Sequence, residues 1–343
     1  MLSTVVRDQL IARGEDADRF CDWPAASWQS LNGAGAFRWS IPQTYGGLGL
    51  SPVEILTGME QIASSCLTTA FILSQREAGV RQLLKGPADL KQRYIPLLAR
   101  GDLFLTVGLS QLSTSRQHLG PSMRATPAAT GGYQLDGEIP WVTGADEAAV
   151  IIVGATLDDS SQLLVLLETH RAGVRIEQPM PLSALTGSRT SLVHCTSVHV
   201  PAEMVLAGPT ENVLGKVGGG GLETSCLAIG LAGAAIDFIE QESGKRPELS
   251  ATVAKLELVR QQCRQELHQF AEMVTPDSDE VLALRIQSTR LALRSTQAAL
   301  MIAKGGGFVT PHPAQRWARQ ALFFLVWSCP RTVAEGVLSD LAT

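Results

Sequence analysis

The chain has 343 residues, of which 45% are hydrophobic and 18% charged, so it is long enough for two or three packed units with a large core. Its formal net charge of -5, from 28 basic and 33 acidic residues, gives no basic field for a phosphate backbone and argues against nucleic acid as a partner. We find neither a run of about 18 apolar residues nor a cleavable leader, and we expect a cytoplasmic protein with no membrane span.

The first hundred residues predict helices. Between Pro52 and Leu73, apolar residues recur at steps of three and four, which indicates one amphipathic helix. The Gly- and Pro-rich segment just before it, IPQTYGGLGLSP, predicts a loop. A second helical stretch runs from Glu77 to Leu98, is broken by Gly86-Pro87, and ends near Gly101.

From Leu103 the pattern changes to short runs of β-branched residues and leucine separated by turn residues. These runs follow one another without helices between them. That order favours an antiparallel meander or small barrel over a doubly wound parallel sheet.

After Pro201 and the glycines at 218–221 the helical pattern returns, with apolar stripes over Val253–Val274 and Val281–Ile302. The sequence therefore predicts an α+β multidomain protein. We place an N-terminal helical domain at residues 1–102, a middle antiparallel β domain at 103–208, and a C-terminal helical bundle at 209–343.

Cysteines and histidines are scattered, with no CxxC pair and no cluster at zinc spacing, so we expect reduced thiols and no metal site. His194 and His199 lie in one predicted strand. Their odd separation predicts that they face opposite sides of the sheet.

Three glycine-rich segments and one tryptophan motif stand out, although each alone is more typical of a turn or of core packing than of a ligand site. The arrangement as a whole, with its helices, β domain and helices in this order, resembles the acyl-CoA dehydrogenase superfamily of flavoproteins over nearly the whole chain. The segments that carry the resemblance are Pro42–Gly49, Tyr133–Gly137 with Trp141-Val142-Thr143, Val198–Pro201, and Gly305–Phe308 followed by His312–Arg319.

The resemblance implies a C-terminal four-helix bundle and an FAD site. Trp141 would pack against the flavin ring, Thr143 would bond near flavin N5, and Leu109 and Ser110 would pass its pyrimidine edge. Ser115 and Arg116, in the loop before the Trp motif, would contact the acyl-CoA substrate.

Gly305, Gly306 and Gly307 would approach the cofactor of a neighbouring subunit, which implies a homodimer or homotetramer. The family commonly has Arg followed by Phe-Gly in the first hairpin of the bundle. This chain has Glu240–Pro247 there, so that arginine is missing or replaced by Lys245 or Arg246.

The largest departure concerns the base. The family removes the α proton of a thioester with a carboxylate, while hydride passes from the β carbon to flavin N5. The usual position of that carboxylate falls on Ser328, and Glu335 lies about two helical turns farther on. Some members carry the glutamate on an earlier helix, and Glu223 matches that position. The alternative interpretation of Glu223 is a first-turn acid at a helix N-terminus.

The sequence leaves three functions open. The leading one is FAD-dependent oxidation of an acyl thioester between its α and β carbons, with Glu223 as the base. Taking Ser328 at face value gives a flavin-dependent monooxygenase that needs no base. The third is a non-catalytic subunit that keeps the fold. The acyl group and the electron acceptor are not specified by the residues.

Overall fold

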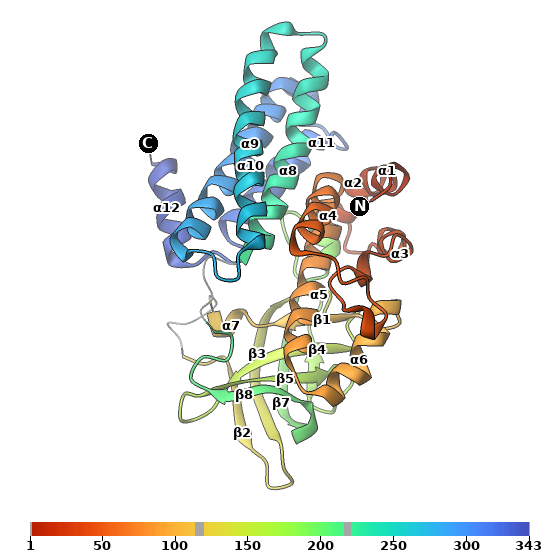
Figure 1. Ribbon diagram of the computed structural model, residues 1–343, viewed down its shortest axis with the longest axis vertical. Coiled ribbons are helices and arrows are strands. Elements are labelled where there is room, and N and C mark those ends of the chain that lie inside the picture. The colour runs from red at the N-terminus through yellow and green to blue at the C-terminus, as the bar shows by residue number, and fades with distance from the viewer. Residues whose placement is uncertain (1, 114–119, 216–220, 343) are drawn as a thin grey trace.

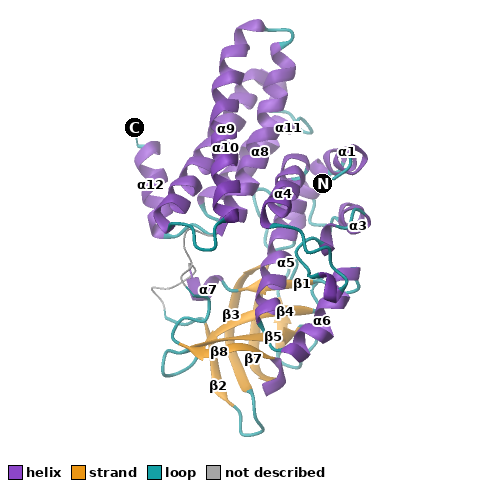
Figure 2. Cartoon of the chain, viewed as in Figure 1, coloured by secondary structure: helices purple, strands orange, loops and turns teal. Residues whose placement is uncertain are grey.

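A computed structural model describes residues 2–113, 120–215 and 221–342. A tall bundle of C-terminal helices stands over one edge of a curved sheet, and the N-terminal helices lie beside both (Figures 1 and 2). The predicted order of helices, sheet and helices is confirmed. The division at residues 102 and 208 stays a prediction.

The N-terminal helices confirm the predicted helical character but not one boundary. The predicted helix over Pro52–Leu73 is two helices, because Cys66 is extended with φ −154° and ψ 102°. Apolar spacing continues on both sides of this break and therefore hides it. Ser51 and Glu54 form a capping box that fixes the start of the first of the two. The helices are α1 (Thr4–Ala12), α2 (Gly14–Arg19), α3 (Ala25–Gly33), α4 (Pro52–Ser65), α5 (Leu67–Lys85) and α6 (Ala88–Arg100).

The middle of the chain forms one sheet with the order β6-β7-β3-β2-β4-β5-β8, and β1 pairs with β4. Most pairs are antiparallel as predicted, but β1 and β2 each pair in parallel with β4, so the sheet is not a simple meander. The long connection between β1 and β4 permits the parallel pairing. The elements are β1 (Leu105–Gly108), α7 (Ser110–Ser113), β2 (Met123–Pro127), β3 (Tyr133–Val142), β4 (Val150–Thr156), β5 (Gln162–Glu168), β6 (Val174–Ile176), β7 (Ser191–Val200) and β8 (Val205–Thr210).

The prediction that His194 and His199 face opposite sides of the sheet is wrong. Between them β7 has a bulge, where Ser197 has φ 51° and the register with β3 shifts. The extra residue reverses the alternation, so both histidines lie on the outer face. Each is bonded locally, and the described part of the chain has no cluster of three or more His, Cys, Asp or Glu side chains that could hold a metal.

The C-terminal helices are α8 (Gly221–Ser243), α9 (Ser250–Glu272), α10 (Ser278–Gly307), α11 (Pro313–Leu322) and α12 (Arg331–Leu341). The predicted apolar stripes fall in α9 and α10, except that Val274, the last residue of the first stripe, lies beyond α9 and is exposed. Within the described residues, α8 alone is long and apolar enough to cross a membrane, but 78% of its apolar window is buried in the fold. Its composition is therefore explained by its place at the centre of the bundle.

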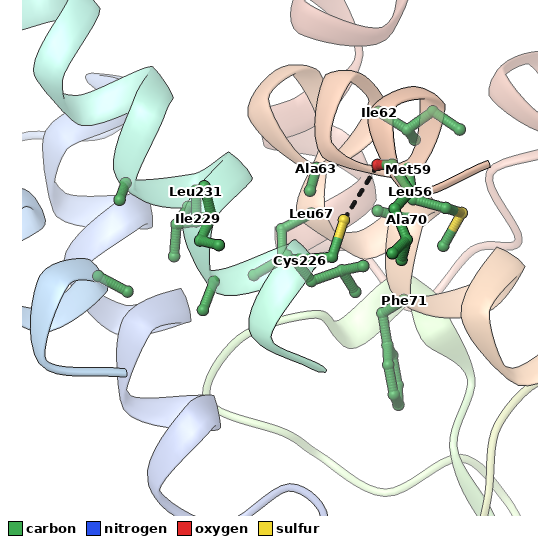
Figure 3. Close-up of a cluster of buried hydrophobic side chains, with 14 of the residues drawn as sticks. Leu56, Met59, Ile62, Ala63, Leu67, Ala70, Phe71, Cys226, Ile229 and Leu231 are labelled. Atoms are coloured by element: carbon green, nitrogen blue, oxygen red, sulfur yellow. Dashed lines mark hydrogen bonds between the residues drawn. The ribbon is translucent and has the colours of Figure 1, made fainter. Parts of the chain in front are cut away.

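Two hydrophobic cores meet at α5. Leu67, Ala70 and Phe71 in its first half pack with α4 and α8, whereas Val80 and Leu83 in its second half pack with the sheet. Figure 3 shows the first core, where Cys226 of α8 donates to the carbonyl oxygen of Leu56 at 3.1 Å. One helix thus connects the bundle to the sheet.

Candidate functional site

Glu223 lies in the first turn of α8, where the sequence predicted it. Its Oε1 is 2.7 Å from Nη1 of Arg81 on α5. The side chains are 26% and 42% exposed, respectively, so the carboxylate is accessible and not enclosed in a core. A helix N-terminus and a guanidinium both favour a negative side chain at this place.

Trp141 stands near the end of β3 in an unusual conformation. Its φ of 61° is in the left-handed region, and it occupies a register shift between β3 and β7. The side chain is 53% exposed, so this large ring is not core packing. Backbone strain of this kind costs about 1–3 kcal/mol and often marks a functional site. The structure therefore offers an exposed aromatic ring held by the sheet.

Thr143 follows two residues later, directly after the end of β3. It is buried, and its Oγ1 lies 3.4 Å from Oγ1 of Thr190, which lies 2.9 Å from Oγ of Ser188. This chain of hydroxyls fixes the end of the strand from inside. Its predicted bond near flavin N5 stays a prediction.

Ser110 comes next to the tryptophan motif. Its Oγ donates to the carbonyl oxygen of Pro140 at 3.2 Å, the residue before Trp141. Leu109 packs against the sheet core. Among the predicted contacts, the structure thus brings Leu109 and Ser110 to the strand end that carries Trp141. Ser115 and Arg116 lie outside the described residues.

Gln111 is a feature that sequence reasoning missed. The residue is nine-tenths buried, and its Nε2 donates to the carbonyl oxygens of Gly108 and Gly154, both at 2.8 Å. Its Oε1 has no hydrogen-bond partner among the residues that the structure describes. Through these two hydrogen bonds, the side chain of Gln111 links β1 to β4 at the residue that follows Ser110. Its position in a hydroxyl-rich loop gave no sign of burial.

Gly305, Gly306 and Gly307 lie at the other end of the bundle. The turn begins at Lys304, whose φ is 56°, and a Cβ on Gly305 or Gly306 would meet no atom within 4 Å. A shallow pocket of about 430 Å³ lies beside this turn and is lined by Phe238, Glu242, Arg246, Ile302, Ala303, Lys304 and His312.

Arg246 is one of the residues that line this pocket. It donates to the carbonyl oxygen of Ile302 at 3.1 Å and lies 2.6 Å from Oε2 of Glu242. Of the two predicted substitutes for the missing arginine, Arg246 is the one in the pocket lining, whereas Lys245 is largely exposed. Glu242 lies nineteen positions after Glu223 on α8, about 30 Å along the helix. One chain does not bring the glycines to the first turn of α8.

Ser328 has φ 45°, and the segment before it is held by Arg285. This fully buried guanidinium donates to the carbonyl oxygens of Phe324 and Trp327 at 3.0 and 3.1 Å. Within the described ranges, no ion pair with a carboxylate is formed by Arg285, and burial lowers its pKa to about 10. Nothing in the local sequence distinguishes Arg285 from a solvent-facing arginine.

The carboxylate of Glu335 is not part of this arrangement. It lies on α12, more than half exposed, and pairs with Arg331 one turn earlier on the same helix. The three candidate positions for a base are Ser328, Glu335 and Glu223. Of the two carboxylates, Glu223 is the one on α8, a helix that packs against both α4 and α5.

Comparisons with known proteins agree with this architecture. The profile of the family described as "Acyl-CoA dehydrogenase, N-terminal domain" matches residues 1–102. "Probable acyl-CoA dehydrogenase YngJ" of Bacillus subtilis (strain 168) is 22% identical over 346 aligned positions, covering 94% of this chain and 90% of the relative.

Solved structures share the fold over nearly the whole chain. Butyryl-CoA dehydrogenase from Megasphaera elsdenii superposes with a TM-score of 0.85 at 18% identity, covering 100% of this chain and 99% of that one. Dibenzothiophene monooxygenase (TdsC) from Paenibacillus sp. A11-2 reaches 0.78 at 17% identity, covering 98% and 94%.

The match over residues 1–102 and the relatives at 22–24% identity support membership of the acyl-CoA dehydrogenase superfamily. Homologous dehydrogenases support a flavoprotein oxidoreductase. Because the same fold also includes a monooxygenase, the residues of the site and not the fold determine the chemistry.

Proposed function

We propose that the protein is an FAD-dependent acyl-CoA dehydrogenase that oxidises an acyl thioester between its α and β carbons. The observation that carries the proposal is Glu223, an accessible carboxylate in the first turn of α8. Ser328, at the position usual for the base, has a hydroxyl that cannot accept the proton at neutral pH.

The residues around Trp141 fit a flavin. The ring of Trp141 is 53% exposed and lies on a strained strand end. Covering it with a flat apolar ligand removes this apolar surface from water and so favours binding. The hydrogen bond from Ser110 to Pro140 holds the start of α7 next to the end of β3 that carries Trp141. FAD, when bound there, would supply the acceptor for the hydride from the β carbon.

Glu223 would act on the other carbon. The α C–H bond breaks, its proton goes to a carboxylate oxygen, and its electron pair becomes the new Cα=Cβ bond as the β hydrogen leaves with its own pair. Partial exposure of Glu223 gives the accepted proton a route to solvent.

We also propose that the active protein is a homodimer or homotetramer. Gly305–Gly307 and Arg246 lie far from the first turn of α8, so they would meet the cofactor of another subunit. Light scattering on the FAD-loaded protein tests this, and a monomer with full FAD content would contradict it.

The deciding experiment is the absorbance of the purified protein before and after a panel of straight-chain, branched and aromatic acyl-CoA esters. We expect yellow protein that bleaches with at least one ester. Glu223→Gln should stay yellow and lose bleaching by at least about 100-fold, the lower range for a general base. Glu335→Gln, which removes the exposed carboxylate seven residues after Ser328, is the matched control and should bleach like wild type. Equal bleaching by Glu223→Gln would remove Glu223 from the mechanism.

A second function is favoured by one observation. Ser328 stands at the position usual for the base on a segment fixed by Arg285, which suits a site that abstracts no α proton. A flavin-dependent monooxygenase would consume oxygen only when reduced flavin is supplied. No oxygen uptake with aromatic and amine substrates would count against it. Protein that purifies colourless and gains no FAD would support the third alternative, a non-catalytic subunit.

A further inference from the structure

We propose that Arg81 is a positioning residue for Glu223, holding its carboxylate toward the α carbon of the substrate. This inference rests on the proposed function. Neither the sequence pattern nor the similarity to known proteins gives Arg81 a role.

The two residues come from opposite sides of the boundary between the cores. Arg81 lies in the half of α5 whose neighbours Val80 and Leu83 pack with the sheet. Glu223 lies one turn before Cys226, which packs in the helical core with α4. Their 2.7 Å contact therefore ties the start of α8 to the part of α5 that packs on the sheet.

Stability alone does not account for this pair. Both side chains are partly exposed, and ion pairs of this kind add little to folding. A flexible glutamate in a first helical turn has several rotamers, and a guanidinium hydrogen bond selects one of them. Because a misplacement of about 1 Å can cost about 100-fold in rate, selecting the rotamer matters for proton abstraction.

The ion pair is broken and formed again during the proposed cycle. When Glu223 has accepted the α proton it is neutral, and Arg81 has lost its counter-charge. Loss of the proton to solvent restores the ion pair and with it the starting position of the base. Arg81 itself exchanges no proton in this cycle.

A double-mutant cycle tests the proposal. Single-turnover bleaching by butyryl-CoA, or by the fastest ester of the panel, is measured for wild type, Arg81→Gln, Glu223→Gln and the double variant. We expect Arg81→Gln to lower the rate about 10- to 100-fold with little change in the ester concentration for half-maximal rate, and Arg81→Lys to recover part of it. In the Glu223→Gln background, Arg81→Gln should add no further loss.

Labelling provides a readout that needs no turnover. Carbodiimide coupling of Glu223 to glycine ethyl ester, followed by peptide mass spectrometry, should be faster in Arg81→Gln than in wild type. Arg100→Gln, which breaks an exposed pair with Asp102, is the matched control and should change neither labelling nor bleaching.

Three results would overturn the proposal. These are wild-type bleaching by Arg81→Gln, an equal loss in the Glu223→Gln background, and an Arg81→Gln protein whose unfolding midpoint falls while Arg81→Lys gives no recovery. Failure of the proposed function is recognised separately, because it requires Glu223→Gln to bleach like wild type.

Discussion

Two glycines of α8 should respond in opposite ways to the same substitution. A Cβ on Gly230 would lie 2.6 Å from the carbonyl oxygen of Glu60 and 2.7 Å from Cβ of Ala63, both fixed parts of α4. The three atoms nearest to a Cβ on Gly233 would all belong to the side chain of Arg260, with Nη1 at 3.1 Å, a distance that a shift of a few tenths of an ångström relieves. Both positions are interior to the helix, so Gly→Ala gains about 0.8–1 kcal/mol of helix propensity at each.

Packing around each glycine decides whether the alanine stabilises or destabilises the protein. At Gly230 the helices must move apart, and overpacking of this kind costs about 1–3 kcal/mol, which exceeds the propensity gain. We expect Gly230→Ala to destabilise the protein by about 1 kcal/mol and Gly233→Ala to stabilise it by about 0.5 kcal/mol. Gly230→Ala should also slow acyl-CoA bleaching, because α4 supports the end of α8 that carries Glu223.

Urea unfolding followed by circular dichroism measures both variants. The comparison is valid where the slopes agree with wild type, since a multidomain chain need not unfold in two states. A Gly230→Ala protein as stable as Gly233→Ala would refute the claim that the α4–α8 contact requires a residue without a side chain.

Three further predictions concern single side chains. Arg285→Met should cost about 2 kcal/mol, because the carbonyl oxygens of Phe324 and Trp327 lose their donor; a neutral or stabilising effect in urea unfolding would contradict this. Trp141→Ala should weaken FAD binding at least about tenfold with little change in the unfolding midpoint of the apoprotein, as titration of flavin fluorescence would show. Ellman's reagent should label exposed Cys21 first, whereas burial raises the pKa of Cys195 to about 12 and should delay its reaction until unfolding; a Cys21→Ser protein that keeps the fast phase would contradict this.

Local signals in the sequence were sufficient for the order of elements and for the place of Glu223. Apolar spacing identified the helices of the bundle, and the glycine run marked the start of α8. The break at Cys66 was not predicted because apolar residues keep the same spacing in both helices. The sequence did not predict that His194 and His199 share a face, because a single bulge residue reverses the alternation of side chains along β7.

Long-range partners could not be predicted in the same way. The Arg81–Glu223 contact depends on how α8 packs across α4 and α5, which no local pattern encodes. Arg285 is likewise buried only because the segment at Phe324 folds back over α10. Parallel pairing of β1 with β4 depends on a connection that passes through two other strands.

The sharing of α5 between the two cores has a consequence for how the protein unfolds. A helix cannot lose half of its turns without weakening the rest, because helix formation is cooperative. Loss of the sheet core would remove the packing of Val80 and Leu83, and the fraying would propagate toward Phe71 in the bundle core. Bundle and sheet should therefore behave as one cooperative unit in hydrogen exchange, with the amides of α5 protected to a similar degree along its length.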